Sequence, residues 1–265
     1  MKTYHFTHSG KLGDTIYAMA TVRELAREHN CRIAVHLIPR PWDNWMLTER
    51  EANHLLPLLR ALPYVASADY LPEMPKFPSQ PFNPDAANQF RQLDWDGMNL
   101  AEAQLRCYAL NRDAWREPWI TVAMLGHVPA VSESAAVLVS RTFRYVIQDF
   151  PWVEIVGAYE EHELAFIGTA PEYYSLCNLW QYRIPYIRTR NLLDVAKVIQ
   201  SSNLHISSQG ANAAISDAMG HALILAHTGA SCNFFPRPNK KHLGPKQLRR
   251  ESDADRLKRV VWGVR

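Results

Sequence analysis

Short apolar stretches alternate along this chain with longer stretches whose apolar residues recur at helical spacing. Near the N-terminus, an apolar stretch at 3–8 precedes a turn at 9–14, and a helical pattern and a second apolar stretch at 32–38 follow. Strand, helix and strand in this order form a βαβ unit, and such units pair their strands in parallel. The first half of the chain is therefore expected to contain a parallel sheet.

The alternation is more regular in the second half of the chain. Five prolines between Pro72 and Pro84 predict an irregular segment before it. We predict an α/β fold with a domain boundary near residue 130, which separates an N-terminal domain at 1–130 from a C-terminal domain of the doubly wound kind at 131–265. The predicted strands are 66–71, 135–139, 164–167, 184–187, 204–206 and 222–225, and the predicted helices are 51–62, 99–110, 152–159, 172–180, 192–200 and 211–219.

The stretch 201–221, SSNLHISSQGANAAISDAMGH, carries the clearest candidate site of the second half. It reads as a strand, a polar turn of Ser207, Ser208, Gln209 and Gly210, and a helix. Such a turn offers unpaired backbone N–H groups and the positive end of a helix dipole, which suit a phosphate or diphosphate. The alternative is an ordinary connection between a strand and a helix.

The turn after the first strand is the second candidate. Gly10 and Gly13 flank Lys11, and Asp14 follows at the start of a helix. The spacing matches neither the dinucleotide-binding GxGxxG motif nor the phosphate-binding GxxxxGK[ST] motif. We interpret Asp14 either as an N-cap of the helix or as a carboxylate that faces a cleft and accepts a proton from a hydroxyl nucleophile.

Composition narrows the class of protein. The 265 residues are 47% hydrophobic and 21% charged, as in a soluble globular protein. Because no apolar run is long enough to span a membrane and the N-terminus lacks the apolar core of a signal peptide, we expect a cytoplasmic protein. The four cysteines form no CxxC pair, so neither a zinc site nor a disulfide framework is expected.

Positive charge is concentrated at the C-terminal end. Ten of the 29 Lys and Arg residues fall between Arg237 and Arg265, against three acidic residues. A basic segment of this kind either contacts a polyanion such as a nucleic acid or forms a solvated surface.

The two turns and their surroundings resemble the heptosyltransferase-like glycosyltransferases of family 9. The resemblance is carried by SGKLGDTIYAMATVREL at 9–25, AFIG at 165–168 and NLLDVAKVIQSSNLHISSQGANAAISDAMG at 191–220, in the order and spacing of the family. It implies the GT-B fold, in which two Rossmann-like α/β domains face each other across a cleft. The C-terminal domain would hold a nucleotide-sugar donor and the N-terminal domain an acceptor.

The resemblance also implies a reaction. Asp14 matches the catalytic base of an inverting transfer from a nucleotide-diphosphate sugar to an acceptor hydroxyl, with no metal and no cofactor besides that co-substrate. Gly10, Lys11 and Gly13 would form the cleft loop. The residues assigned to donor binding are Arg141, Arg144, Thr169, Glu172, Ser207, Ser208, Gln209, Gly210 and Asn212.

Several assignments have alternatives. Arg141 and Arg144 either neutralise the diphosphate or are surface charges, with Arg144 covering an aromatic neighbour. Glu172 either holds ribose hydroxyls or is a carboxylate favoured at a helix start. The chain also departs from the family, because Ser-Gln-Gly at 208–210 and Ala213 replace the usual Asp-Thr-Gly and a following His. The identity of the donor is therefore not carried over.

The acceptor is predicted only as one of two classes. One is a surface glycan, and the other is a hydroxymethylated base in DNA, which the basic segment at 237–265 favours. A non-catalytic nucleotide-, sugar- or nucleic-acid-binding protein that retains the cleft is the rival interpretation. The replaced Asp and His support that rival.

Overall fold

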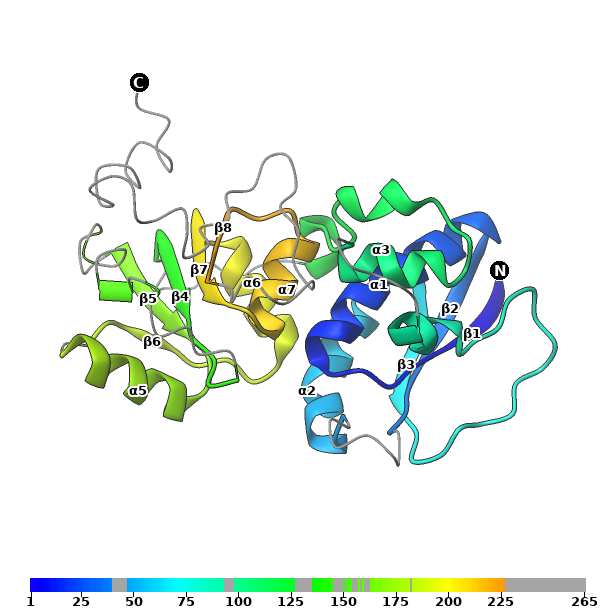
Figure 1. Cartoon of the computed structure of the whole chain (residues 1–265), viewed down its shortest axis with the longest axis horizontal. Helices are drawn as coiled ribbons and strands as arrows, with labels where there is room; N and C mark the ends of the chain where they lie inside the picture. The colour runs from blue at the N-terminus through cyan, green and yellow to red at the C-terminus, as the bar shows by residue number, and fades with distance from the viewer. Residues whose placement is uncertain are drawn as a thin grey trace, which may run out of the picture.

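Two parallel sheets, one in each half of the chain, organise the molecule (Figure 1). The computed structural model describes residues 1–39, 47–92, 98–126, 135–144, 150, 152–153, 157, 159, 163–181 and 183–226. The predicted boundary near residue 130 and the basic segment at 237–265 lie outside these residues.

The first half forms a parallel sheet of three strands among the described residues, in the order β1-β2-β3. The predicted βαβ unit is confirmed, with Phe6 paired to Val35 across β1 and β2. The proline-containing segment at 71–85 carries neither helix nor strand, also as predicted. The elements are β1 (Lys2–His8), α1 (Leu12–Glu28), β2 (Cys31–Leu37), α2 (Glu49–Arg60), β3 (Val65–Tyr70), η1 (Ala86–Gln92), α3 (Leu100–Arg106), η2 (Arg112–Arg116) and η3 (Val122–Leu125).

Helix α3 is shorter than the predicted 99–110. Asn99 precedes it as the N-cap, and its side chain accepts a hydrogen bond from the Ala101 N–H at 2.8 Å. The helix ends at Arg106, and Ala109 takes a left-handed conformation with φ 55°. A non-glycine residue in that region marks a turn, which apolar spacing alone does not reveal.

The second half forms a parallel sheet of five strands within the described ranges, in the order β6-β5-β4-β7-β8. In chain order this is 3-2-1-4-5, the doubly wound arrangement, and the strand order reverses between β4 and β7. Ligands of such sheets bind beyond the carboxyl ends of the strands at this reversal. The elements are β4 (Val137–Ser140), β5 (Leu164–Ile167), α5 (Ala170–Trp180), β6 (Tyr186–Ile187), α6 (Leu192–Gln200), β7 (Leu204–Ser208), α7 (Ala211–Ala218) and β8 (Leu223–Ala226).

The predicted strands and helices of this half recur with small shifts at their ends. Helix α6 covers the predicted 192–200, and α5 and α7 begin at or within two residues of the predicted starts. The helix predicted at 152–159 lies mostly outside the described residues.

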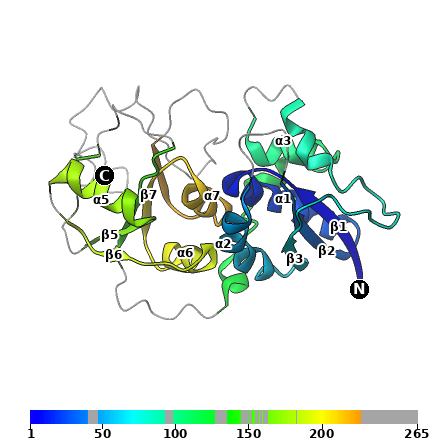
Figure 2. The same ribbon diagram turned by 90° about the horizontal axis from the view of Figure 1, so that it is seen from below.

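Helices join the two sheets into one body. Helix α1 packs against α7, and α2 packs against α6 (Figures 1 and 2). One apolar core takes buried side chains from both halves, including Ile16 and Leu55 from the first and Ile199 and Ile215 from the second. The two halves are therefore held together by side-chain packing as well as by the connecting polypeptide.

Candidate functional site

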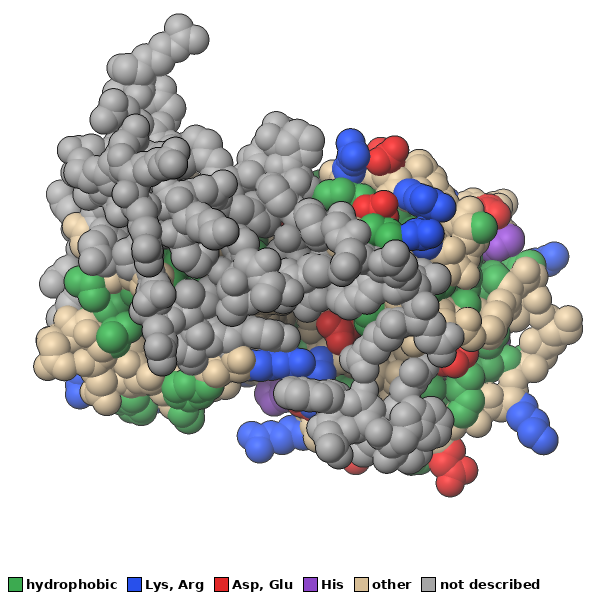
Figure 3. All heavy atoms as spheres, viewed as in Figure 1, with side chains coloured by type: hydrophobic (Ala, Val, Ile, Leu, Met, Phe, Trp, Pro, Cys, Tyr) green, Lys and Arg blue, Asp and Glu red, His purple; other side chains and the backbone are tan. Residues whose placement is uncertain are grey.

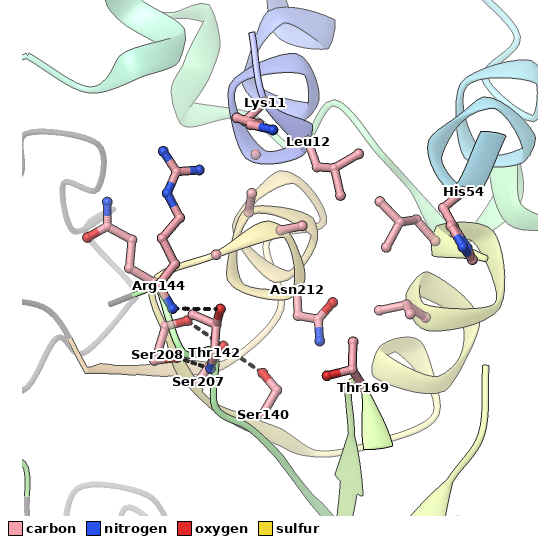
Figure 4. Close-up of a pocket in the computed structure, with 18 of the residues that line it drawn as sticks. Lys11, Leu12, His54, Ser140, Thr142, Arg144, Thr169, Ser207, Ser208 and Asn212 are labelled. Carbon is pink, nitrogen blue, oxygen red and sulfur yellow. Dashed lines mark hydrogen bonds between the residues drawn. The ribbon is translucent and has the colours of Figure 1, made fainter. Parts of the chain in front are cut away.

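A cavity of about 530 Å³ lies between the two halves, beyond the carboxyl ends of the strands (Figure 4). Residues of both predicted domains line it. The first glycine turn and α2 contribute from one side, and the ends of β4, β5 and β7 contribute from the other. A cavity of this size at the reversal of a doubly wound sheet is a typical ligand site.

Five helix N-termini in the described part of the chain meet at this cavity. Its lining includes a residue of the first turn or the N-cap of each helix: Leu12 of α1, Arg50 of α2, Thr169 before α5, Asn191 before α6 and Gly210 before α7. Each N-terminus carries partial positive charge and N–H groups without intrahelical partners. Their convergence favours an anionic ligand.

The second glycine turn forms the floor of the cavity. Gly210 has no side chain to cap α7, and the first residues of that helix line the cavity. The hydroxyl of Ser207 lies 2.7 Å from Ser140 Oγ and donates to the Ser208 carbonyl at 2.8 Å. Ser208 Oγ accepts the Thr142 N–H at 2.8 Å. The structure thus brings the predicted serines to the cavity, but internal hydrogen bonds use their oxygens.

The remaining predicted donor residues on this side are Gln209, Asn212, Thr169 and Glu172, and all line the cavity. Gln209 is buried, whereas Asn212 and Thr169 point into the open space (Figure 4). Glu172 Oε2 accepts hydrogen bonds from the Thr169 N–H at 2.9 Å and the Thr169 hydroxyl at 2.8 Å. This geometry is a capping box, so the helix-start interpretation of Glu172 has a direct structural basis.

Both predicted arginines line the cavity. Arg141 is half-buried, and its Nη1 donates to Ser175 Oγ at 3.1 Å. Burial lowers the pKa of the Arg141 guanidinium, while the nearby charge of Glu172 raises it. Arg144 is exposed, and its side chain extends toward Lys11 at the start of α1 (Figure 4). Both arginines therefore place a positive charge in the cavity wall, and the hydrogen bond to Ser175 anchors the Arg141 side chain.

Asp14 lies on the opposite wall, in the third position of α1. Its Oδ2 accepts the Lys11 N–H at 3.3 Å, and Lys11 is the N-cap. The N-cap interpretation of Asp14 is thus corrected: Asp14 is the third helical residue, and its carboxylate accepts the backbone N–H of the N-cap. Gly10 is required here, because a Cβ atom would lie 2.6 Å from His8 Cε1 and 2.7 Å from Asp14 Cβ.

The two glycine turns meet each other. A Cβ atom on Gly13 would lie 4.0 Å from the Ala214 Cβ and 4.0 Å from the backbone of Gly210. The start of α1, which carries Asp14, therefore lies next to the start of α7 at the floor of the cavity.

The Lys11 side chain forms an ion pair with Glu51. Its Nζ lies 3.2 Å from both carboxylate oxygens of Glu51, in the first turn of α2. Burial raises the pKa of Glu51, but hydrogen bonds from Thr48 and Lys11 outweigh that effect and leave the pKa below its usual range. The pair links the starts of α1 and α2.

Sequence analysis did not identify the contribution of α2 to the site. Arg50, Glu51 and His54 line the cavity, and the His54 ring Nδ1–H donates to the Arg190 carbonyl across the two halves at 3.0 Å. On the face seen in Figure 3, Lys or Arg side chains gather beside a His side chain where the halves meet. The capping pattern of Thr48 and Glu51 marks the start of α2 in the sequence, but it does not place that start at the cavity.

The described residues offer neither a metal-ligand cluster nor a membrane-spanning helix. Among them, no three or more His, Cys, Asp or Glu side chains are grouped so that they could hold a metal ion. Their helices are too short or too polar to span a bilayer.

A cavity between two parallel α/β sheets, with a glycine turn from each sheet, defines the GT-B class of fold. Solved structures with this fold match nearly the whole chain. The E. coli heptosyltransferase WaaC with ADP is 11% identical, with 99% of each chain covered and a TM-score of 0.63. E. coli ADP-heptose lipopolysaccharide heptosyltransferase II is 10% identical, with 99% of each chain covered and a TM-score of 0.58.

A family 9 glycosyltransferase from Veillonella parvula is 8% identical, with 99% of this chain and 98% of that chain covered and a TM-score of 0.55. No family model and no curated protein sequence matches the chain. The predicted GT-B fold and the resemblance to heptosyltransferases are confirmed at the level of the fold.

Proposed function

We propose that the protein is an inverting glycosyltransferase that moves a sugar from a nucleotide-diphosphate sugar to an acceptor hydroxyl. The observation that carries the proposal is a cavity at which five helix N-termini meet Arg141 and Arg144, with Asp14 in the first turn of α1 on the wall opposite the ends of β4, β5 and β7. The helix N-termini and the arginines suit a diphosphate, and the Asp14 carboxylate suits proton transfer from a hydroxyl.

The donor diphosphate would lie against the starts of α5 and α7, within reach of Arg141 and Arg144. Backbone N–H groups, helix dipoles and guanidinium groups together offset the negative charge that develops on a leaving diphosphate. This arrangement supports a reaction that needs no metal ion. The E. coli heptosyltransferase WaaC has been solved with ADP and with ADP-2-deoxy-2-fluoro heptose, which supports a nucleoside-diphosphate ligand for this fold.

Asp14 would act as the base. Its carboxylate accepts the proton of the acceptor hydroxyl as that oxygen forms a bond to the anomeric carbon of the donor sugar. The bond from the anomeric carbon to the phosphate oxygen breaks, and its electron pair leaves with the nucleoside diphosphate. Attack on the face opposite the leaving group inverts the configuration at the anomeric carbon.

Asp14→Asn tests this role without removing the capping interaction. The amide oxygen of Asn still accepts the Lys11 N–H, so the helix start is kept, but the side chain no longer accepts a proton. We expect transfer to fall by about 100-fold or more, as for loss of a general base, with the Kd of the nucleoside diphosphate nearly unchanged. Radiolabelled sugar transfer and calorimetry measure the two quantities.

Asp113→Asn is the matched control, because Asp113 is exposed, pairs with Arg116 and is not one of the residues that line the cavity. That variant should transfer sugar like the wild type. Unchanged transfer by the Asp14→Asn variant contradicts the base assignment. Nucleotide binding without transfer by the wild-type protein supports the rival non-catalytic interpretation.

The acceptor is proposed only as a molecule with a free hydroxyl. The DNA acceptor depends on the basic segment at 237–265, outside the described residues, so glycan and hydroxymethylated base both stay predictions. A steep loss of activity with rising salt would favour DNA, because each neutralised phosphate releases counterions.

A further inference from the structure

A buried chain of hydrogen bonds runs beneath the floor of the cavity. His205 of β7 is fully buried, with Nδ1 2.6 Å from Ser216 Oγ of α7 and Nε2 2.9 Å from Ser140 Oγ at the end of β4. Ser140 Oγ lies 2.7 Å from Ser207 Oγ, and the Ser207 hydroxyl lies 2.8 Å from the Ser208 carbonyl oxygen. The chain therefore crosses from β7 to β4 and back, at the reversal of strand order.

The direction of this chain follows from its last member. A carbonyl oxygen only accepts, so the single hydroxyl hydrogen of Ser207 goes to the Ser208 carbonyl. Ser140 must then donate to Ser207, and because Ser140 has no second hydrogen, it accepts from His205 Nε2–H. The His205 imidazole is thereby fixed as the Nε2–H tautomer.

The contact between His205 and Ser216, at the other end of the hydrogen-bond chain, fits a neutral His205 imidazole. Burial and the neighbouring His221 lower the pKa of His205 to about 3. In a neutral Nε2–H imidazole, Nδ1 carries a lone pair, and the Ser216 hydroxyl donates to it. Each hydrogen in the chain then has one acceptor.

The hydrogen-bond chain ends at residues next to the candidate site. Ser140 directly precedes Arg141, and Ser207 is the first residue of the turn, three positions before Gly210. Ser140 and Ser207 are also register partners in the pairing of β4 with β7. A bond between these two hydroxyls holds together the strand ends from which an arginine and a helix N-terminus reach the cavity.

We propose that His205 is a positioning residue of the site, which acts by donating Nε2–H to Ser140. Through that bond it fixes the ends of β4 and β7, and so the geometry of Arg141 and the Gly210 turn toward an anionic ligand. The nature of the ligand, a nucleoside diphosphate, rests on the proposed function. The tautomer and the strand-end geometry do not.

Nitrogen-15 NMR of the histidines tests the direction of the chain in the intact protein. We expect His205 to show a neutral ring protonated at Nε2, without titration between about pH 5 and pH 8. A ring protonated at Nδ1, or one that titrates in that range, would overturn the proposal.

Two substitutions separate positioning of the site from filling of the core. The side-chain amide nitrogen of Gln reaches the place of His Nε2, whereas that of Asn reaches only the place of Nδ1. His205→Gln therefore retains a donor for Ser140, and His205→Asn retains a polar group only beside Ser216. Asn is one methylene smaller than Gln, so thermal melting is measured for each variant to give its own structural cost.

Calorimetry with the nucleoside diphosphate that the wild type binds gives the decisive comparison. We expect His205→Asn to weaken binding by about tenfold and His205→Gln by less than about threefold, because one hydrogen bond to the site is lost in the first case only. In transfer assays the same difference should appear mainly in the KM of the donor. Equal weakening in both variants, in proportion to their melting temperatures, would mean that His205 has only a structural role.

Amide hydrogen exchange supplies a readout that needs no ligand. The Thr142 N–H donates to Ser208 Oγ at the joined strand ends. It should exchange faster in His205→Asn than in His205→Gln. If the wild type binds no nucleoside diphosphate, the proposed function fails, and exchange and NMR alone decide the role of His205.

Discussion

Gly168 shows how tightly single residues are packed around the candidate site. Its φ is 155°, and a Cβ atom there would lie 2.9 Å from the Phe166 ring and 3.1 Å from Glu172 Oε2. The Glu172 oxygen is the one that caps α5. A side chain at this position would therefore displace both a core ring and a helix cap.

We expect Gly168→Ala to lower the free energy of unfolding by about 2 to 4 kcal/mol, from backbone strain and overpacking together. Urea unfolding measures it. Gly126→Ala is the matched control, because Gly126 also has a positive φ, 71°, but no atom of the described residues, its chain neighbours aside, lies within 4 Å of its added Cβ. It should lose only the free energy of backbone strain, about 1 to 3 kcal/mol and less than Gly168→Ala, because φ 71° with ψ −168° is a region that essentially only glycine adopts. An equal loss in both variants would show that packing at Gly168 does not matter.

The sequence indicates some site residues because they follow local patterns. Asp14, Ser207 and Gly210 stand where an apolar strand ends and a helix begins, and the carboxyl ends of parallel strands share one edge of a sheet. The pairing of Lys11 with Glu51 has no such pattern. It depends on how α2 packs beside α1, which local spacing does not encode.

The helix starts are the elements that give the site its charge, and side-chain caps fix most of them. Thr48 Oγ1 accepts the Glu51 N–H at 3.2 Å, and Glu51 Oε2 accepts the Thr48 N–H at 2.8 Å and the Thr48 hydroxyl at 2.9 Å. This capping box holds the first turn of α2 at the cavity and leaves Glu51 placed to bind Lys11.

Thr48→Ala should cost about 1 kcal/mol of stability, because it removes an N-cap hydroxyl. The pKa of Glu51 is lowered in the folded protein, so its stabilising contribution is present above its ordinary pKa of 4.5 and is lost as pH falls through the folded value. The variant loses part of that contribution. Its deficit in urea unfolding should therefore be larger at neutral pH than near pH 3. A deficit that grows in acid would contradict this role of the pair.

Elements with both an amphipathic pattern and a cap residue are predictable from the sequence, as α6 shows. Asn191 accepts the Asp194 N–H at 3.0 Å, and the helix covers the expected residues. Helix α3 ends early because of a left-handed Ala109, a residue without a sequence signal for that conformation. The sequence leaves the role of Glu172 open, because a carboxylate at this place suits either ribose hydroxyls or a helix start.

At the scale of the whole molecule, the two sheets share one apolar core. The backbone N–H groups of Trp119 and Ile120 also donate to the Ala218 carbonyl, at 3.0 and 3.2 Å, across the halves. The contacts between α1 and α7 and between α2 and α6 complete the connection (Figure 2). The α/β class and the order of elements follow from the sequence, but this shared core depends on tertiary packing between distant segments.

Buried His205 makes the stability of the whole fold sensitive to acid. Its pKa falls from an ordinary 6.5 to about 3 on folding, so the unfolded chain binds a proton that the folded protein excludes between these values. Stability from this group is therefore complete above about pH 6.5 and is lost as pH falls toward 3, at about 1.4 kcal/mol per pH unit.

His205→Gln carries no titrating ring, so its unfolding free energy should fall less steeply than that of the wild type between pH 6 and pH 4. Urea unfolding at several pH values measures both slopes. Identical slopes would contradict a neutral, buried His205.

The proposed function requires the cavity between the sheets to bind the diphosphate of a nucleotide sugar. The most direct test is titration calorimetry of the wild-type protein with UDP, GDP, ADP, CDP and dTDP, each with and without a chelator of divalent metals. We predict that at least one of them binds and that the chelator leaves its Kd unchanged, because helix N-termini and arginines supply the positive charge. Binding of none of the five would rule out a nucleotide-diphosphate site in this cavity, and binding that disappears with the chelator would show that the site depends on a metal ion.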